Sequence, residues 1–344
     1  MGSDVEPNLY RGYFGIVNSA VAKSTWSKYS SALNTFACFE ADSRKVFPWP
    51  LPLSACRSFI VWGSTVRKLS HSTLKSYLSA IKFMHTLRGF NCDYISKDST
   101  ISLLMKGVSK IALSLPSTNI RRVVTIPLLI TIGSKIARAP WDPLTKQVIW
   151  CAATTSFFGS LRLGEILAPS ETEHSMLSDL TWNDVKASSP DSILIRIKQP
   201  KSGEKEEYVD LFPFPTHDCC PVAALKNLKK KQILAGVYEK NSPVFRFGSG
   251  KNLTMNHFNS ILSTLLSDIC LPGISKITCH SFRAGIPSTI SLFPELATSD
   301  LIKGWGRWAS DCYTRYTRLK LPQKHNIFQQ ISGALRTLLP SRPD

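Results

Sequence analysis

Apolar residues recur at helical spacing four times in the N-terminal third of the chain, and these four stripes predict four amphipathic helices. Ser24 and Ser54 precede the first two stripes as candidate N-caps, and the third stripe stops near Gly89. The members are Trp26, Tyr29, Leu33 and Phe36; Ala55, Phe59, Trp62 and Val66; Leu74, Tyr77, Ile81 and Met84; and Ile101, Leu104, Val108 and Ile111. The stripes are expected to form the core of a small helical bundle.

The helical pattern is interrupted between Leu113 and Ile126, where Pro, Ser, Thr and Asn surround the adjacent pair Arg121 and Arg122. This interruption predicts a linker over residues 117–126. The predicted domains are then an N-terminal helical unit over residues 1–116 and a second unit over residues 127–344.

The second unit contains one convincing β signal. Ile193, Ile195 and Ile197 alternate with other residues, and YVDLF follows after a polar stretch, which predicts a strand, a loop and a strand. Helical patterns fill the rest, at 143–159 behind Asp142, at 222–234, at 256–269, around His280, Leu301 and Tyr316, and at 328–338. The expected fold class is mainly α with a small antiparallel sheet in the second domain (α+β).

Charge changes this picture of an ordinary globular protein. Lys and Arg number 42 against 24 Asp and Glu, a formal net charge of +18, which suits a polyanionic partner such as nucleic acid, although solubility alone is the alternative explanation. Lys68, Lys75, Lys82 and Arg88 flank or lie on the second and third predicted helices and are candidate phosphate contacts, as are the two linker arginines. Equally, they could be solvated side chains.

Membrane and secreted classes are disfavoured. No apolar run reaches the roughly 20 residues of a membrane-spanning helix, and the nine cysteines lack the regular spacing of a disulfide framework. His217, Cys219 and Cys220 lie close together without a second pair, so we interpret them as structural and expect no metal site. An intracellular protein is expected.

Four short motifs follow one another along the second unit. FFGSLRLGEIL places Arg162 three residues before Glu165, and HSFRAG places His280 three residues before Arg283, so each pair would share a helix face. IKQPKSGEK places Lys201 at the predicted hairpin tip. GWGRWASDCYTRYTR contains Trp308 and Tyr316. Taken singly, each motif has an ordinary interpretation as a surface ion pair, a solvated turn or core, and only their order is informative.

In that order the motifs resemble the tyrosine recombinase family of phage-integrase type. The resemblance spans about Pro127 to Arg318, and HSFRAG and GRWASDCYTRYTR are most similar to recombinases of eukaryotic mobile elements of the Crypton and DIRS groups. The family's first motif often reads G-L-R, whereas Ser160 follows Gly159 here. Trp308 occupies a position that is often His, and Pro287 is expected to shorten or kink the helix after HSFR.

The resemblance implies a role for each motif residue. Arg162 and Arg283 would hold the non-bridging oxygens of the scissile phosphate, because guanidinium groups stay charged and present two donors in a plane. Tyr316 would attack the phosphorus with the help of His280, and Lys201 would protonate the departing 5′ oxygen. Glu165 would orient His280 or Arg162, and Trp308 would donate its indole hydrogen or pack beside the phosphate. No cofactor is implied.

Tyr313 is an alternative nucleophile because it lies three residues before Tyr316, on what is predicted to be the same helix. We favour Tyr316 because it stands in RYTR, before a short polar pair, as the family's nucleophile does.

The resemblance further implies a two-domain clamp on double-stranded DNA, assembling as a dimer on one site and a tetramer in synapsis, and nuclear in a eukaryote. The apolar stripe at 328–338 could dock on a neighbouring protomer or cap its own domain. Two rival functions are a catalytically silent DNA-binding protein derived from such an enzyme and a type IB topoisomerase. The complete motif set disfavours the first, and the motif spacing and small N-terminal bundle disfavour the second.

Overall fold

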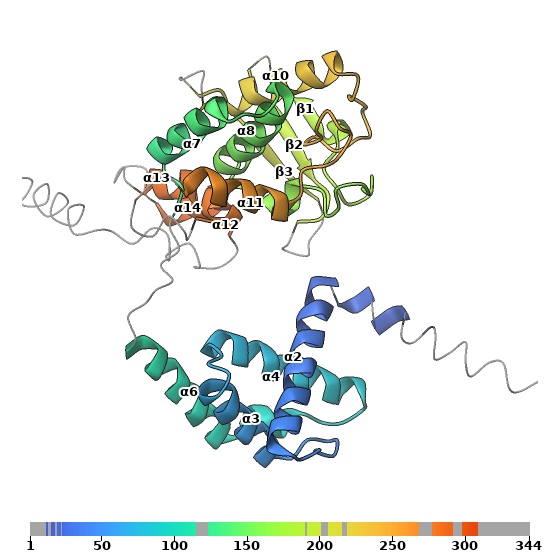
Figure 1. The fold of residues 1–344 in the computed structure, drawn as a ribbon, viewed down its shortest axis with the longest axis vertical. Helices are drawn as coiled ribbons and strands as arrows, with labels where there is room; N and C mark the ends of the chain where they lie inside the picture. The colour runs from blue at the N-terminus through green and yellow to red at the C-terminus, as the bar shows by residue number, and fades with distance from the viewer. Residues whose placement is uncertain are drawn as a thin grey trace, which may run out of the picture. The chain divides into compact units, whose positions relative to one another are not determined.

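The chain forms two compact units in the computed structural model, over Met1–Thr118 and Asn119–Asp344 (Figure 1). The structure describes residues 12, 15–17, 19–21, 23–114, 123–189, 191–200, 206–214, 219–267, 277–291 and 298–308. Within these ranges the chain is mainly helical with one small antiparallel sheet, so the predicted fold class is confirmed.

The first unit is a helical bundle, and the four predicted helices are present. Its elements are α2 (Lys23–Ser43), α3 (Leu53–Thr65), α4 (His71–Leu87), the short α5 (Asp93–Lys97) and α6 (Ser99–Ser114). Phe36, Phe39, Phe59 and Trp62 meet in an aromatic cluster between α2 and α3. Ring edges packed against ring faces account for part of the stability of this core.

Four details of the predicted bundle were wrong. Ser24 lies inside α2 and Ser54 inside α3, which Pro52 precedes as the N-cap, so neither serine caps its helix. Val66 and Ile111 are 61% and 66% exposed instead of buried. Val66 already stands beyond the last turn of α3, where the helical spacing no longer directs a side chain to the core.

The second unit contains the remaining helices and the sheet. They are α7 (Ile126–Arg138), α8 (Pro143–Phe158), α9 (Leu163–Ile166), the 3-10 turn η1 (Trp182–Asp184), β1 (Val185–Ala187), β2 (Ile193–Ile197), β3 (Glu207–Leu211), α10 (Pro221–Leu234), α11 (Met255–Leu266), α12 (Cys279–Arg283), α13 (Gly285–Ile290) and α14 (Ser299–Gly306). Helix α7 and strand β1 had no specific prediction. Pro287 lies in α13, and α12 ends at Arg283, in line with the expected shortening.

Helix α8 runs through the second unit and packs against α7, α10, α12 and α13 (Figure 1). Asp142 caps it as predicted, because its carboxylate accepts hydrogen bonds from the backbone N–H groups of Leu144 and Thr145. The second half of the helix, residues 151–158, is buried on all sides, which explains why this half contains only apolar and small residues.

The sheet has the order β1-β2-β3, with both pairs antiparallel. Ile193, Ile195 and Ile197 of β2 are buried and their neighbours are less so, as the alternating pattern predicted. In the register of β2 with β3, Ile197 pairs with Glu207. This register places Glu207 at the end of the hairpin that carries the polar loop.

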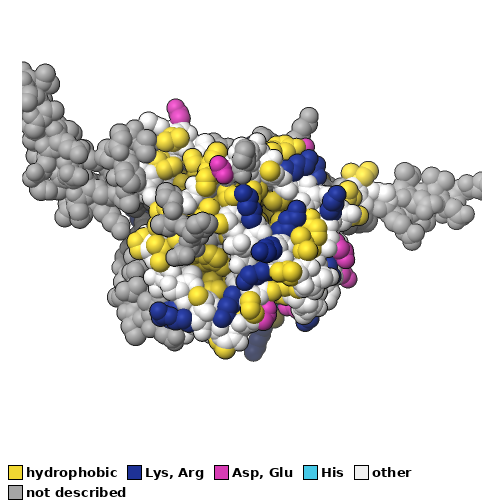
Figure 2. All heavy atoms as spheres, turned by 90° about the horizontal axis from the view of Figure 1, so that it is seen from above, with side chains coloured by type: hydrophobic (Ala, Val, Ile, Leu, Met, Phe, Trp, Pro, Cys, Tyr) yellow, Lys and Arg dark blue, Asp and Glu magenta, His cyan; other side chains and the backbone are white. Residues whose placement is uncertain are grey.

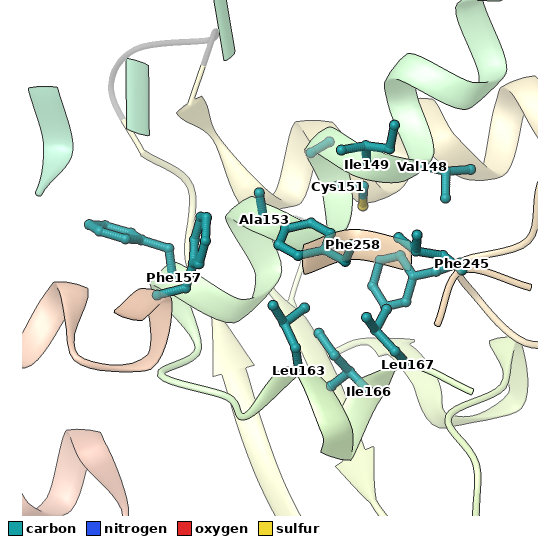
Figure 3. Close-up of a cluster of buried hydrophobic side chains, with 14 of the residues drawn as sticks. Val148, Ile149, Cys151, Ala153, Phe157, Leu163, Ile166, Leu167, Phe245 and Phe258 are labelled. Atoms are coloured by element: carbon teal, nitrogen blue, oxygen red, sulfur yellow. The ribbon is translucent and has the colours of Figure 1, made fainter. Parts of the chain in front are cut away.

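The core of the second unit supports the short helix α9 from behind. Figure 3 shows Leu163, Ile166 and Leu167 directed toward Phe245, Phe258 and residues of α8. Leu163 and Ile166 are three apart and therefore lie on one face of α9, which fixes the orientation of the helix. The residues on its other face are consequently held in place by the core.

Positive side chains are distributed widely over the surface. Figure 2 shows a row of Lys and Arg side chains crossing one face between hydrophobic and neutral residues. Helix α10 alone carries Lys226, Lys229 and Lys230, all exposed. Among the helices that the structure describes, none is both long and apolar enough to cross a bilayer.

Candidate functional site

Arg162 and Glu165 form the first part of the candidate site. Arg162 is the N-cap residue of α9 and has an extended backbone, so it precedes the helix instead of lying on its face as expected. Its Nη1 lies 2.6 Å from Glu165 Oε1, and its backbone N–H donates to Oε2 at 3.0 Å. The Glu165 carboxylate is 4% exposed, whereas the Arg162 side chain keeps 30% of its surface in solvent.

Arg283, the last residue of α12, is the second part of the candidate site. Its neighbour Phe282 packs against Phe258 of α11, and Gly285 lies so close to Phe157 of α8 that a Cβ there would stand 2.1 Å from the ring. Only glycine permits this approach of α12 and α13 to α8. The approach places Arg283 in the interior, where it is 1% exposed.

The turn after α14 completes the cluster. Arg283 Nη2 donates to the carbonyl of Gly306 at 2.6 Å, and the guanidinium carbon lies 5.7 Å from the centre of the Trp308 ring. Arg307 has a left-handed backbone with φ of 51°, and Trp308 follows the turn, outside the helix. Thus Arg283, the Gly306–Arg307 turn and Trp308 pack as one group.

Arg307 connects this group to the other half of the unit. Its Nη2 donates to Glu165 Oε2 at 2.7 Å, and its Nη1 donates to Glu207 at the start of β3. Glu165 is therefore shared by three guanidinium groups, because Arg283 Nη1 also lies 3.6 Å from Oε2. Three positive groups face two carboxylates, which leaves a net positive charge in a mostly buried site.

Burial and charge shift the ionisation of this site. Burial lowers the pKa of Arg283 to about 10, and repulsion from Arg162 acts in the same direction. Burial alone would raise the pKa of Glu165, but attraction to Arg307 and hydrogen bonds from Arg162 outweigh it and hold the pKa below its ordinary value. At neutral pH Glu165 and Arg283 are therefore both charged.

Several buried donors in the cluster have no hydrogen-bond acceptor among the described residues. They are Nε and Nη1 of Arg283 and Nε of Arg307. An unpaired buried donor costs on the order of 1–3 kcal/mol, and more when it is charged. Such a concentration of unused positive donors is the arrangement that a bound oxyanion would satisfy.

The other predicted catalytic residues divide into two groups. His280 lies on α12, partly exposed, on the same short helix as Arg283. Lys201 and Tyr316, together with the alternative Tyr313, lie outside the described residues, as does the predicted C-terminal helix at 328–338. The structure therefore brings together Arg162, Glu165, Arg283 and Trp308 from the predicted set.

A second lysine in the hairpin is already engaged. Lys198 is three residues before Lys201, and its Nζ lies 2.7 Å from the buried carboxylate of Asp184 and donates to the carbonyl of Asp179 at 2.9 Å. Its side chain is 10% exposed. Lys198 thus stabilises the hairpin base and is not available for chemistry.

The predicted basic contacts of the first unit differ in exposure. Lys68, Lys75 and Arg88 are exposed, and the Arg88 guanidinium covers the Trp49 ring at 4.1 Å. Lys82 is partly buried and donates to Ser96 Oγ at 3.1 Å, so it is the least accessible of the four. Arg121 and Arg122 lie outside the described ranges.

Sequence reasoning missed Arg307 and Glu207. Arg307 stands within the motif GWGRWASDCYTRYTR, directly before Trp308, and Glu207 lies at the end of the polar loop. The sequence signal for either was weak, because nothing in their local spacing shows that they meet across the fold. Among the described residues, no group of three His, Cys, Asp or Glu side chains is placed to bind a metal ion.

Ser160 marks a strained point beside the site. Its φ is 47°, a left-handed conformation that favours glycine, and its fully buried Oγ has no hydrogen-bond partner in the described part of the chain. We expect Ser160→Gly to raise the free energy of unfolding by about 1 kcal/mol, because it removes both costs. Thermal and denaturant unfolding would measure this gain.

Ser160→Ala is the matched control for that prediction. It removes the hydroxyl but keeps a Cβ in the left-handed conformation, so the gain should be smaller than with glycine. A glycine variant that unfolds at a lower temperature than the native protein would contradict the assignment of strain.

No protein-family model and no curated protein matches the sequence. Solved structures do match. A post-cleavage complex of the XerH site-specific recombinase with palindromic difH substrate has a TM-score of 0.58 at 14% identity, covering 89% of this chain and 78% of that one. The Tn1549 transposon integrase bound to transposon right end DNA has a TM-score of 0.58 at 12% identity, covering 91% and 95%. A lambda integrase dimer bound to a COC′ core site has a TM-score of 0.53 at 13% identity, covering 90% and 75%.

These three proteins are tyrosine recombinases or integrases, and the chain shares their fold. At such low identity the likeness concerns the fold, and the chemistry has to be argued from the residues of this chain.

Proposed function

We propose that this protein is a tyrosine recombinase that cleaves and rejoins double-stranded DNA through a 3′-phosphotyrosyl intermediate. The observation that carries the proposal is the meeting of Arg162 and Arg283 on one carboxylate, Glu165, although the two arginines come from motifs far apart in the sequence. Neither local pairing nor core packing explains why two guanidinium groups converge here while buried donors of one of them, Arg283, stay unused.

The arginine pair suits a phosphodiester in transition. As a nucleophile attacks, negative charge increases on the non-bridging oxygens, so fixed donors around them lower the barrier. Arg283 is held by the Gly306 carbonyl and the Trp308 ring, and Arg162 is held by Glu165. Because both groups are positioned beforehand, little reorganisation is needed when the phosphate arrives.

The remaining steps are assigned to the other motif residues. The Tyr316 hydroxyl attacks phosphorus and loses its proton, for which His280 is the proposed acceptor. The bond from phosphorus to the 5′ oxygen breaks, and Lys201 supplies the proton that the departing oxygen takes up. Rejoining is the reverse reaction: the 5′ hydroxyl attacks the phosphotyrosine and Tyr316 leaves. The phosphodiester energy is conserved in the tyrosyl bond, so the reaction requires no nucleotide cofactor.

The proposal includes a partner and an assembly. The XerH structure is a complex with its difH substrate, the Tn1549 integrase is bound to transposon right end DNA and the lambda integrase dimer to a core site. The net charge of +18 on this chain suits a DNA partner. We propose a dimer on one DNA site and a tetramer in synapsis, acting as the integrase of a Crypton-like or DIRS-like mobile element, and nuclear in a eukaryote. The wording of HSFRAG and GRWASDCYTRYTR supports this finer assignment.

Capture of the covalent intermediate tests the proposal. The protein would be incubated with short nicked duplexes of randomised sequence, because loss of the fragment beside the nick traps the adduct. Protein–DNA adducts that survive denaturation would be isolated and their DNA sequenced. The expected result is enrichment of a common sequence, which then serves as a defined substrate. Absence of any adduct across the library, in a protein that binds DNA, would favour the catalytically silent alternative.

DNA binding itself should depend steeply on salt. Each phosphate neutralised by Lys or Arg releases counterions, so the logarithm of the affinity should fall linearly with the logarithm of the salt concentration. Between about 50 and 200 mM salt we expect a loss on the order of 10³-fold for a protein with several phosphate contacts. Titration of labelled duplex at several salt concentrations measures the slope, and a flat response would contradict a DNA partner.

A further inference from the structure

The hydrogen bonds around Glu165 are distributed unevenly among the three arginines. Oε2 accepts from the backbone N–H of Arg162 at 3.0 Å and from Nη2 of Arg307 at 2.7 Å. A carboxylate oxygen has two lone pairs in its plane, and these two donors occupy them. Arg283 Nη1 stays 3.6 Å away from the same oxygen, beyond hydrogen-bonding distance.

Because Arg307 occupies Oε2, Arg283 does not pair fully with Glu165. In a buried site, an unpaired carboxylate lone pair attracts the nearest cationic donor strongly. Were Oε2 to lose Arg307, Arg283 Nη1, which already lies 3.6 Å from this oxygen, could replace it. Arg283 would then pair fully with Glu165, and fewer of its donors would remain to hold an oxyanion.

We infer that Arg307 is a positioning residue, which occupies Glu165 so that Arg283 keeps its donors for the scissile phosphate. The inference rests on the proposed function for its reaction readout. Glu207 contributes by holding Nη1 of Arg307, which fixes the guanidinium between α9 and β3. Both Nη groups of Arg307 are engaged by carboxylates and only its Nε keeps an unused donor, so its main contribution is made through Arg283.

The first variant to test is Arg307→Gly. Glycine accepts the left-handed backbone at this position, so the turn before Trp308 is preserved while the guanidinium is removed. On the defined nicked duplex we expect adduct formation to slow about 100-fold, comparable to the loss of one transition-state donor. DNA affinity should change little, since Arg307 contributes through positioning.

The decisive variant adds Glu165→Gln to Arg307→Gly. A neutral amide no longer attracts Arg283 as a carboxylate does. The double variant should therefore form the adduct about 10-fold faster than Arg307→Gly does. A residue with a merely structural role would give the opposite result, with the second substitution adding to the damage. A double variant as slow as Arg307→Gly, or slower, overturns the inference.

Glu207→Gln gives a milder test should Arg307→Gly fold poorly. It removes the carboxylate that holds Nη1 of Arg307, and we expect the rate of adduct formation to decrease about 10-fold. Glu206→Gln is its matched control, because Glu206 is the adjacent carboxylate but pairs with Arg196 and Tyr208 instead. Equal rates for the two variants would overturn the proposed fixing role of Glu207.

A second readout separates this inference from the proposed function. Inorganic phosphate, compared with chloride at equal ionic strength, should raise the unfolding temperature of the native protein, because it satisfies the donors of Arg283. The shift should shrink in Arg307→Gly and return in the double variant. If the native protein forms no DNA adduct while this pattern holds, the proposed function fails and the role of Arg307 stands. An unchanged phosphate shift in Arg307→Gly overturns the inference.

Discussion

Replacing Tyr316 with phenylalanine should reduce formation of the denaturation-resistant DNA adduct below detection, a loss of at least about 10⁴-fold. Phenylalanine keeps the ring but lacks the oxygen that bonds to phosphorus, so no covalent intermediate can form. Binding to the same duplex should be nearly unchanged, because the variant loses one hydroxyl and no charge. Gel electrophoresis under denaturing conditions measures the adduct, and titration of labelled duplex measures the binding.

Tyr313→Phe is the control for this result. It tests the alternative nucleophile within the same segment and should leave the adduct rate within a few-fold of the native rate. The reverse outcome, an adduct in Tyr316→Phe and none in Tyr313→Phe, would move the nucleophile to Tyr313. Peptide mapping of the native adduct would identify the modified tyrosine independently.

A conservative change of Arg283 to lysine should have the second largest effect. Arg283 contacts the Gly306 carbonyl through Nη2 while its other donors remain unused. A single ammonium group cannot bind this carbonyl and also present the same donors to an oxyanion. We expect adduct formation to fall by about 10²–10³-fold, as when a transition-state donor is lost. Rates on the nicked duplex, with unfolding temperatures measured in parallel, check this expectation.

The pH profile gives that prediction a separate check. The pKa of Arg283 is lowered to about 10, so its charge persists at neutral pH and is lost only as the pH rises through that value. Burial lowers the pKa of a lysine as well, starting from a smaller ordinary value. The residual activity of Arg283→Lys should therefore decline at a lower pH than the native activity does.

Arg246→Lys is a control, because Arg246, although only partly buried, also donates to a backbone carbonyl, from Nε to that of Gly250. It belongs to the turn between Phe245 and Asn252 and has no contact with Glu165 among the described residues. Its rate should stay close to native. An Arg283→Lys protein as active as Arg246→Lys would contradict the proposed role of Arg283.

Much of the fold was predictable where periodicity and burial coincide. The alternating isoleucines of β2 lie in the core, and Asp142 begins α8, because both signals are local and depend on few neighbours. Predictions failed near helix ends. Val66 continues the apolar spacing of α3 but stands past its last turn, since tertiary packing and not the spacing decides where a helix stops.

The candidate site shows the same division. HSFRAG and SLRLGE identified Arg283 and Arg162, since each motif is a short run of residues with recognisable chemistry. Their local geometry was predicted less well: Arg162 precedes α9 instead of sharing a helix face with Glu165. Four residues suffice for α9 because Leu163 and Ile166 anchor it in the core, and no sequence window of that length contains a reliable helical signal.

The sequence by itself determined the fold class, the order of the motifs and the candidate residues for the proposed phosphoryl chemistry, because these depend on local pattern and on side-chain identity. Only the tertiary structure decided that Arg307 and Glu207 join the cluster and that Lys198 is taken by Asp184. These pairings link residues distant along the chain, and their energies depend on burial and on the few ångströms between charges. Local spacing contains no information about either quantity.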